Sequence, residues 1–355
     1  MAPRALRPAI SIAVKAASIL PLKWIRALSG TNLVVPYYHM VSDAPVAHVS
    51  HLYRFRTVAE FTADVEFLSR HFEPVSLGDI VEALNGQRVL SRPCFHLTFD
   101  DGFREMHDVV APILQRAGAP ATFFLNTAFL DGGGMAHHNV ISLVLDKLTT
   151  AGKSLTEATQ RRIESLLPAS LEPNRTLRER LLAIPYAQRA VLGPIAEALE
   201  IDLNEYIEVN QPYLTSAQVQ ALINAGFSIG AHSHDHPLYR DLSLADQVSQ
   251  TRISIELLQG KFGLTTKAFA FPHTDTGVKD AFFSTVFSER LIDVSFGTGG
   301  LVPHSCPRNI ERVSMEKTSV SAREILARQF ARATRFRLKV GNRRAQVNQP
   351  VASVV

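Results

Sequence analysis

The strongest constraint on the fold of this chain is an alternation of short apolar runs with segments of helical periodicity. Runs of strand length occur at 32–38, 94–99, 121–125, 227–231, 268–271 and 292–296. Segments in which apolar residues recur at helical spacing are found at 57–72, 77–84, 104–117, 216–225, 244–262, 284–290 and 321–333. Strand, helix and strand in succession imply right-handed crossovers, so we predict an α/β domain built on a parallel sheet.

A long stretch without strand character interrupts this alternation. From about 136 to 210, after three consecutive glycines at 132–134, the apolar residues follow helical spacing only. We predict a helical insertion there, which either covers one side of a functional cleft or forms an oligomer contact through an exposed apolar face. With 355 residues and 46% hydrophobic content, the chain is long enough to bury a large core.

The formal net charge of +4 is unevenly distributed along the chain. Five basic residues precede the first acidic residue, Asp43, and seven follow the last one, Glu324. With those twelve set aside, 25 basic residues face 33 acidic ones, so the middle of the chain is acidic. The basic ends favour contact with an anionic membrane surface, and the acidic body argues against nucleic acid as a partner.

The N-terminal segment is apolar but does not resemble a signal peptide. Between 9 and 28 the apolar run is interrupted by Lys15 and Pro21, and no clear small-residue cleavage site follows. It is too short to span a bilayer, so it is either an interfacial helix with Trp24 at its edge or a helix packed on the domain. Only Cys94 and Cys306 are present, and we expect free thiols. We therefore predict a cytoplasmic protein, peripheral on the inner membrane face.

Two polar motifs follow two of the strand candidates. Asp100 and Asp101 come directly after the run 94–99, and His232 and His236 come after the run 227–231. Active sites of barrels lie at the C-terminal ends of parallel strands. Two imidazoles and a carboxylate can bind one divalent cation with open positions for water and substrate. Successive side chains of an extended chain point apart, so Asp101 can join the two histidines while Asp100 acts on water.

The motifs resemble those of the polysaccharide deacetylase family, whose core is the NodB homology domain. The resemblance rests on TFDDG at 98–102, PATFF at 120–124, the stretch from LTS at 214–216 to GF at 226–227, and GAHSHDHP at 230–237. It covers roughly 33–327 and implies a distorted (β/α)7-type barrel with a helical insertion. On this basis 31–330 is the catalytic domain, with the insertion at about 136–210. A basic amphipathic segment (1–30) precedes it and a basic tail (331–355) follows.

The resemblance also implies a reaction and a ligand set. Members of the family remove an acetyl group from an N-acetylated sugar with the help of a divalent metal. Carried over to this sequence, Asp101, His232 and His236 bind the metal, and Asp100 is the general base toward metal-bound water. Zinc suits such ligands best, although cobalt, nickel or iron would also fit. FPH at 271–273 resembles the proline-containing loop that supplies an oxyanion donor, so His273 is expected to contribute its main chain, its side chain or both.

Two parts of the family pattern are displaced or missing. Many members carry an arginine that pairs with the catalytic aspartate, but this sequence has Ala270 at that place. Arg308 and Arg312 resemble a later segment of a subset of the family, and either is expected to orient Asp100. No clear match to the histidine that serves as general acid is found, and His304 is a weak substitute alongside His273.

Other polar residues allow a catalytic and a structural interpretation. His39 ends the first strand candidate, where it either faces the site or is a core histidine. Asn126 either reaches substrate or caps a turn. His137 and His138, beside three glycines, are expected in a mobile loop rather than in a second metal site, and His234 is expected to face away from the metal.

The predicted function is therefore metal-dependent deacetylation of an acetylated amino-sugar glycan, as a polysaccharide, an oligosaccharide or a lipid-linked sugar. Two alternatives stay open at this point. One is a catalytically inactive carbohydrate-binding protein with the same fold, and the other is a deformylase or an O-acetyl esterase acting on a related sugar. The sequence does not determine the oligomeric state.

Overall fold

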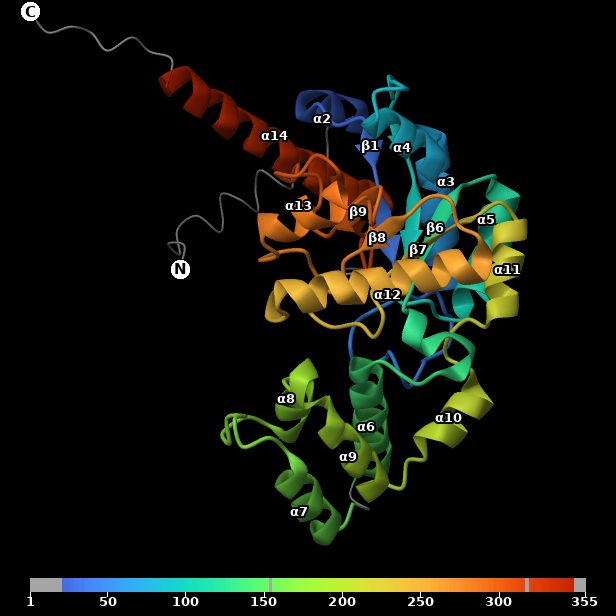
Figure 1. The fold of residues 1–355 in the computed structure, drawn as a ribbon, viewed down its shortest axis with the longest axis vertical. Helices are drawn as coiled ribbons and strands as arrows, with labels where there is room; N and C mark the ends of the chain where they lie inside the picture. The colour runs from blue at the N-terminus through green and yellow to red at the C-terminus, as the bar shows by residue number, and fades with distance from the viewer. Residues whose placement is uncertain (1–20, 153–154, 317–318, 348–355) are drawn as a thin grey trace, which may run out of the picture.

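The computed structural model describes residues 21–152, 155–316 and 319–347 (Figure 1). Its main sheet has eight strands in the order β10-β9-β8-β7-β6-β5-β2-β11, and every neighbouring pair is parallel. The strands are β2 (Pro36–Tyr38), β5 (Leu97–Phe99), β6 (Ala121–Leu125), β7 (Ser228–Ala231), β8 (Ala268–Ala270), β9 (Val294–Gly297), β10 (Asn309–Glu311) and β11 (Val313–Ser314). A smaller parallel sheet, in the order β1-β4-β3, contains β1 (Leu33–Val34), β4 (Cys94–Phe95) and β3 (Glu73–Pro74).

The two ends of the main sheet are joined through a single residue. β10 pairs with β9 at one end of the sheet, and β11 pairs with β2 at the other. Only Arg312 lies between β10 and β11 in the sequence. The sheet therefore curls into a nearly closed barrel whose seam is at Arg312, and the predicted distorted (β/α) barrel is confirmed.

Helices surround the barrel and begin where the sequence offers caps. They are α3 (Val58–His71), α4 (Leu77–Leu84), α5 (Ala111–Ala117), α11 (Ser216–Asn224), α12 (Leu244–Phe262) and α13 (Asp280–Ser288). Thr57, Ser76 and Thr215 each form a capping box, in which the side chain accepts a hydrogen bond from the backbone N–H three residues on. Phenylalanines and leucines are the commonest residues of the buried core, and the rings of Phe99 and Phe123 lie 5.2 Å apart.

The stretch predicted as an insertion is helical and has a core of its own. It contains α6 (His137–Ala151), α7 (Glu157–Leu166), α8 (Leu177–Leu182), α9 (Leu192–Ala198) and α10 (Leu203–Asn210). These helices pack around buried aliphatic side chains, among them Ile141, Val144, Ile163, Leu181 and Ile195. Figure 1 shows this group of helices below the barrel, as a separate lobe.

The two ends of the described chain pair with each other. α2 (Leu22–Ser29) packs against α14 (Ala322–Val347). The helix predicted at 321–333 is therefore longer than expected, and most of the segment predicted as a tail is helical. This stretch of α14 contains no proline, and its Arg, Ala and Leu residues favour a helix. Residues 1–20 of the predicted amphipathic segment lie outside the described residues.

Two further predictions can be compared with the described residues. Cys94 and Cys306 are free thiols, as expected. Among the helices of the described ranges, none combines the length and the apolar composition that crossing a membrane requires.

Candidate active site

The two aspartates occupy a turn directly after β5. The strand ends at Phe99, and Asp101 and Gly102 both have left-handed backbone conformations, with φ of 77° and 75°. A Cβ at Gly102 would lie 3.3 Å from the Leu125 side chain, so glycine suits this close approach. We predicted that Asp100 and Asp101 point apart because side chains alternate along a strand. That reason was wrong, because the strand ends before both residues. A strained turn, of the kind found at functional sites, orients the second carboxylate.

Asp101, His232 and His236 form a compact group of ligand atoms. Asp101 Oδ1 lies 3.1 Å from His236 Nε2 and 3.4 Å from His232 Nε2, and all three residues are buried. His232 Nδ1 lies 2.9 Å from the carbonyl oxygen of Ala270. That carbonyl accepts the Nδ1 proton, so in the neutral ring the lone pair of Nε2 faces Asp101. A histidine oriented in this way is typical of a metal ligand.

These residues fit a divalent cation because their polar atoms are otherwise poorly satisfied. Asp101 Oδ1 and His236 Nδ1 are buried and have no hydrogen-bond partner. A buried carboxylate oxygen facing two imidazole lone pairs is unfavourable unless a positive charge lies between them.

The loop after β7 is shaped to present both histidines to Asp101. Ser233 and His236 have φ of 68° and 67°, so the loop turns sharply instead of continuing as a helix. The His236 N–H donates to Ser233 Oγ at 3.0 Å. Asn126, at the end of β6, donates from its side chain to the carbonyl of His232 at 2.5 Å. Asn126 therefore positions the loop, and His234 turns away, with Nδ1 3.0 Å from Thr127 Oγ1.

Asp100 forms a buried, two-point ion pair with Arg312. The Nη1 and Nη2 atoms of Arg312 lie 2.7 Å from the two carboxylate oxygens. The guanidinium also donates to the carbonyl of Gly297 at 3.1 Å and stacks over the ring of Tyr37. Burial raises the pKa of Asp100, and the positive charge of Arg312 is the largest of the influences that lower it. The pKa of Asp100 is on balance below its usual value.

The expectation that Arg308 could orient Asp100 was wrong, because Arg312 fills that role. Arg308 donates to the carbonyl of Asp293 at 2.9 Å and to Asn85 Oδ1 at 2.7 Å, and the structure gives it no contact with Asp100. Arg308 precedes β10, whereas Arg312 lies at the seam of the barrel and reaches the end of β5. The two arginines resemble each other in sequence context, but only the closure of the barrel distinguishes them.

His39 and Glu316 form a second charged pair at the same site. His39 Nδ1 donates to Glu316 Oε2 at 2.6 Å, and the backbone N–H groups of His39 and Met40 donate to the other oxygen. Burial lowers the pKa of His39, but the charge and hydrogen bond of Glu316 raise it to a net value of about 9. His39 therefore carries a positive charge at neutral pH, which favours the catalytic interpretation over the core interpretation.

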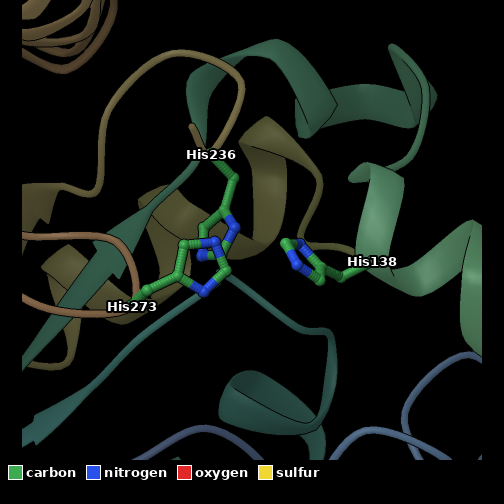
Figure 2. Close-up of side chains that lie close together, drawn as sticks. All are labelled: His138, His236 and His273. Atoms are coloured by element: carbon green, nitrogen blue, oxygen red, sulfur yellow. The ribbon is translucent and has the colours of Figure 1, made fainter. Parts of the chain in front are cut away.

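The insertion contributes His138 to the site. Figure 2 shows the rings of His138, His236 and His273 gathered together, with His138 coming from the start of α6. The centroid of the His273 ring lies 4.4 Å from that of His236 and 4.5 Å from that of His138. Burial lowers the pKa of His138 to about 4, so this ring is neutral. The prediction of a mobile loop at this position was wrong because α6 begins at His137.

His273, the residue expected to help form the oxyanion site, lines the cavity, whereas His304 does not. His304 Nδ1 accepts a hydrogen bond from the N–H of Cys306, and its ring packs on Phe283. His304 also belongs to a separate group with Asp275 and Glu311. It is thus unsuited as the general acid of the Asp101 site.

The site opens into a cavity of about 560 Å³ between the barrel and the insertion. Its wall includes Tyr37, His39, Tyr53, Asp101, Glu316 and His273 from the barrel side, and His138, Asn139 and Leu182 from the insertion. This volume lies within the usual range for small-molecule pockets. A cavity of about 610 Å³ beside α10 is somewhat larger, but none of the clusters of potential metal ligands found among the described residues lines it.

Comparison with known proteins identifies the domain. The family model for polysaccharide deacetylase matches residues 87–152 and 197–281, and the gap between the two stretches falls within the insertion. The chain therefore contains a polysaccharide deacetylase domain, which indicates a hydrolase of the deacetylase type. No curated protein sequence matches it.

Solved structures share the fold at low sequence identity. The deacetylase PplD of Streptococcus pyogenes, in complex with acetate, has a TM-score of 0.53 and 15% identity, covering 84% of this chain and 98% of that chain. A de-N-acetylase from Aggregatibacter actinomycetemcomitans has a TM-score of 0.51 and 16% identity, covering 82% and 97%. IcaB from Ammonifex degensii has a TM-score of 0.51 and 15% identity, covering 84% and 97%. The likeness establishes the fold, which extends over most of this chain.

Proposed function

We propose that this protein is a metal-dependent deacetylase that hydrolyses the N-acetyl group of an amino sugar in a polysaccharide, an oligosaccharide or a lipid-linked glycan. One observation carries the proposal: a three-residue ligand set and a charged imidazole lie at one cavity, and an ion-paired carboxylate is buried directly beside the ligand set. A carbohydrate-binding protein without activity would not require such a combination. Its presence favours an enzyme.

Asp101, His232 and His236 would hold the cation. Zinc suits two imidazoles and a carboxylate best, and cobalt, nickel or iron would also bind. When bound, a divalent cation lowers the pKa of water and polarises a carbonyl oxygen. The residues around the ligand set would then move protons and hold the substrate.

Asp100 is positioned to accept a proton from the attacking water. Arg312 binds both carboxylate oxygens, so the carboxylate has one orientation and its ionised form is stabilised. At His273 a main-chain N–H would stabilise the oxyanion that develops on the acetyl carbonyl. Removal of one such donor costs about 3 kcal/mol in enzymes where it has been measured.

His39 is positioned to donate a proton to the amine nitrogen as the carbon–nitrogen bond breaks. Glu316 holds the Nδ1 proton, so the Nε2 proton is the one available for transfer. His39 lines the same cavity as Asp101, His236 and His273. The pair of His39 and Glu316 would thus supply the general acid that sequence comparison does not locate.

The pH dependence of the reaction is expected to report on His39. The donor proton is lost as pH rises through the pKa, so kcat should fall on the basic side. A cation at Asp101 repels the charge on His39, which moves this fall below pH 9. In Glu316→Gln the amide still accepts the backbone hydrogen bonds, but the charge that raises the pKa is gone. Rate profiles should then show the basic limb shifted down by about one to three pH units. An unchanged limb would exclude His39 as the donor.

The reaction itself is tested by measuring acetate release from a panel of N-acetylhexosamine oligosaccharides. O-acetylated and N-formylated sugars of the same chain length serve as matched alternatives. Release from the N-acetyl substrates, at higher kcat/KM than from the alternatives, is expected. A preference for the ester or the formamide would replace the proposed substrate, and binding without turnover on every member would indicate an inactive carbohydrate-binding protein.

A further inference from the structure

We propose that the surface formed by α2 and the second half of α14 docks on an anionic membrane surface. We call it the α2–α14 face and define it by Lys23, Trp24, Arg26 and Leu28 of α2 and by Arg335, Phe336, Arg337, Leu338 and Lys339 of α14. This inference does not depend on the proposed reaction, because the face shares no residue with the cavity around Asp101.

The α2–α14 face exposes an unusual share of the apolar surface. Nine large hydrophobic side chains are exposed among the described residues, and four of them belong to this face: Trp24, Leu28, Phe336 and Leu338. Leu22 and Ile25 turn toward the core, whereas Trp24 and Leu28 are 62% and 64% exposed. Trp24 and Leu28 are four residues apart, so they lie on the same side of α2. Single exposed apolar residues are ordinary, but a group of them indicates an interaction surface.

The two helices pack against each other, and the residues 335–339 of α14 are exposed around the helix next to α2. α2 and α14 make extensive contacts, and Figure 1 shows them side by side at the end of the molecule opposite the insertion. α2 ends at Gly30, whose φ is 70°, and the guanidinium of Arg337 packs over this glycine. Arg337 therefore also lies at the C-terminal end of α2, where a positive charge is favourable.

The charge of the face selects an anionic partner. Its five basic residues, Lys23, Arg26, Arg335, Arg337 and Lys339, form no ion pair with any residue in the described ranges. The only acidic residue of α2 and α14 is Glu324, which pairs with Arg328. The sequence beyond the face has the same bias, with Arg4, Arg7 and Lys15 before it and Arg343 and Arg344 after it. A second copy of the chain would bring like charges together. The expected partner of the face is therefore a bilayer that contains acidic lipids.

The combination of residue types fits the membrane interface. Tryptophan prefers the level of the lipid headgroups, and basic side chains beside apolar ones bind anionic lipids while the apolar groups enter the interface. The cavity around Asp101 is lined by the insertion as well as by the barrel, and Figure 1 shows the insertion at the end of the molecule opposite α2. Docking would therefore leave the cavity open to substrate.

The sequence provides a specific probe, because Trp24 is the only tryptophan in the chain. The full-length protein would be mixed with vesicles of phosphatidylglycerol and phosphatidylcholine, and with vesicles of phosphatidylcholine alone. We expect the fluorescence of Trp24 to shift to shorter wavelength with the anionic vesicles only, and the shift to decrease as salt is added. Co-sedimentation with the same vesicles measures the affinity.

Charge-reversal variants distinguish this face from general attraction to lipid. Arg335→Glu combined with Arg337→Glu should weaken co-sedimentation by a factor of about ten or more, since each basic residue near an anionic surface contributes measurably. Arg161→Glu combined with Arg162→Glu, on exposed positions of α7, changes the net charge equally and should bind as the wild type does.

Four outcomes would overturn the proposal, three of them in the vesicle experiments. The first is no binding to anionic vesicles, the second is equal binding to neutral vesicles, and the third is equal weakening by both double variants. A fluorescence shift that depends on protein concentration without lipid would also contradict it, because a second copy would then cover the face. None of these results would bear on acetate release, so failure here is distinct from failure of the proposed reaction.

Discussion

Replacing Asp100 with asparagine is expected to lower kcat for acetate release by a factor of about 10² to 10⁴, the usual contribution of a positioned general base. Asparagine keeps the size of the side chain and an oxygen that can accept from Arg312, but it cannot take a proton from water. KM should change little, because Asp100 is buried and does not line the cavity.

The content of bound metal is the control for this variant. Asp100 lies outside the ligand set, so Asp100→Asn should bind the same amount of zinc as the wild type, whereas Asp101→Asn should bind less. Both quantities are measured on the same preparations, by elemental analysis and by acetate release from an N-acetylhexosamine oligosaccharide. If Asp100→Asn hydrolyses that substrate at the wild-type rate, Asp100 is not the base.

Replacing Arg312 with methionine is expected to destabilise the protein by about 3–5 kcal/mol, because one charge of a buried ion pair would remain without its partner. Arg312 is fully buried, and Asp100 is 2% exposed. The substitution also removes the hydrogen bond to Gly297 and the stacking on Tyr37 at the seam of the barrel. Urea unfolding at neutral pH, followed by circular dichroism, gives the free energy of unfolding.

Arg308→Met is the matched control, since it removes an arginine four residues away that does not contact Asp100. Its hydrogen bonds to Asn85 and Asp293 are at or near the surface. A loss of about 1 kcal/mol is expected, in line with ordinary hydrogen bonds. Equal destabilisation by the two substitutions would mean that the ion pair of Asp100 and Arg312 has no special role in the fold.

The parts of the site that follow strand ends could be predicted from the sequence. In a parallel barrel the C-terminal ends of all strands meet at one rim, so Asp101 after β5 and the histidines after β7 converge without further information. The alternation of strands and helices, and its interruption from about 136 to 210, depend on local periodicity, which the sequence displays directly.

The remaining residues of the site depend on contacts between segments that are distant in the sequence. The local sequence pattern does not predict such contacts. Glu316 pairs with His39 across 277 positions, because β11 docks beside β2 when the barrel closes. The same closure brings Arg312 to Asp100 and leaves Arg308 outside. His138 enters the cavity only because the insertion folds back against the barrel. A helical start at His137, instead of a loop, was the one local feature that could have indicated it.

The most direct measurement is acetate release from an N-acetylhexosamine oligosaccharide by the wild-type protein, before and after a chelator removes its metal, and after zinc is restored. We expect release to stop on chelation and to return with about one equivalent of zinc per chain, because Asp101, His232 and His236 form one ligand set. His232→Ala should not recover under the same conditions. Acetate release that is unaffected by complete removal of metal, or that zinc restores equally in His232→Ala, would contradict the proposed metal-dependent deacetylase.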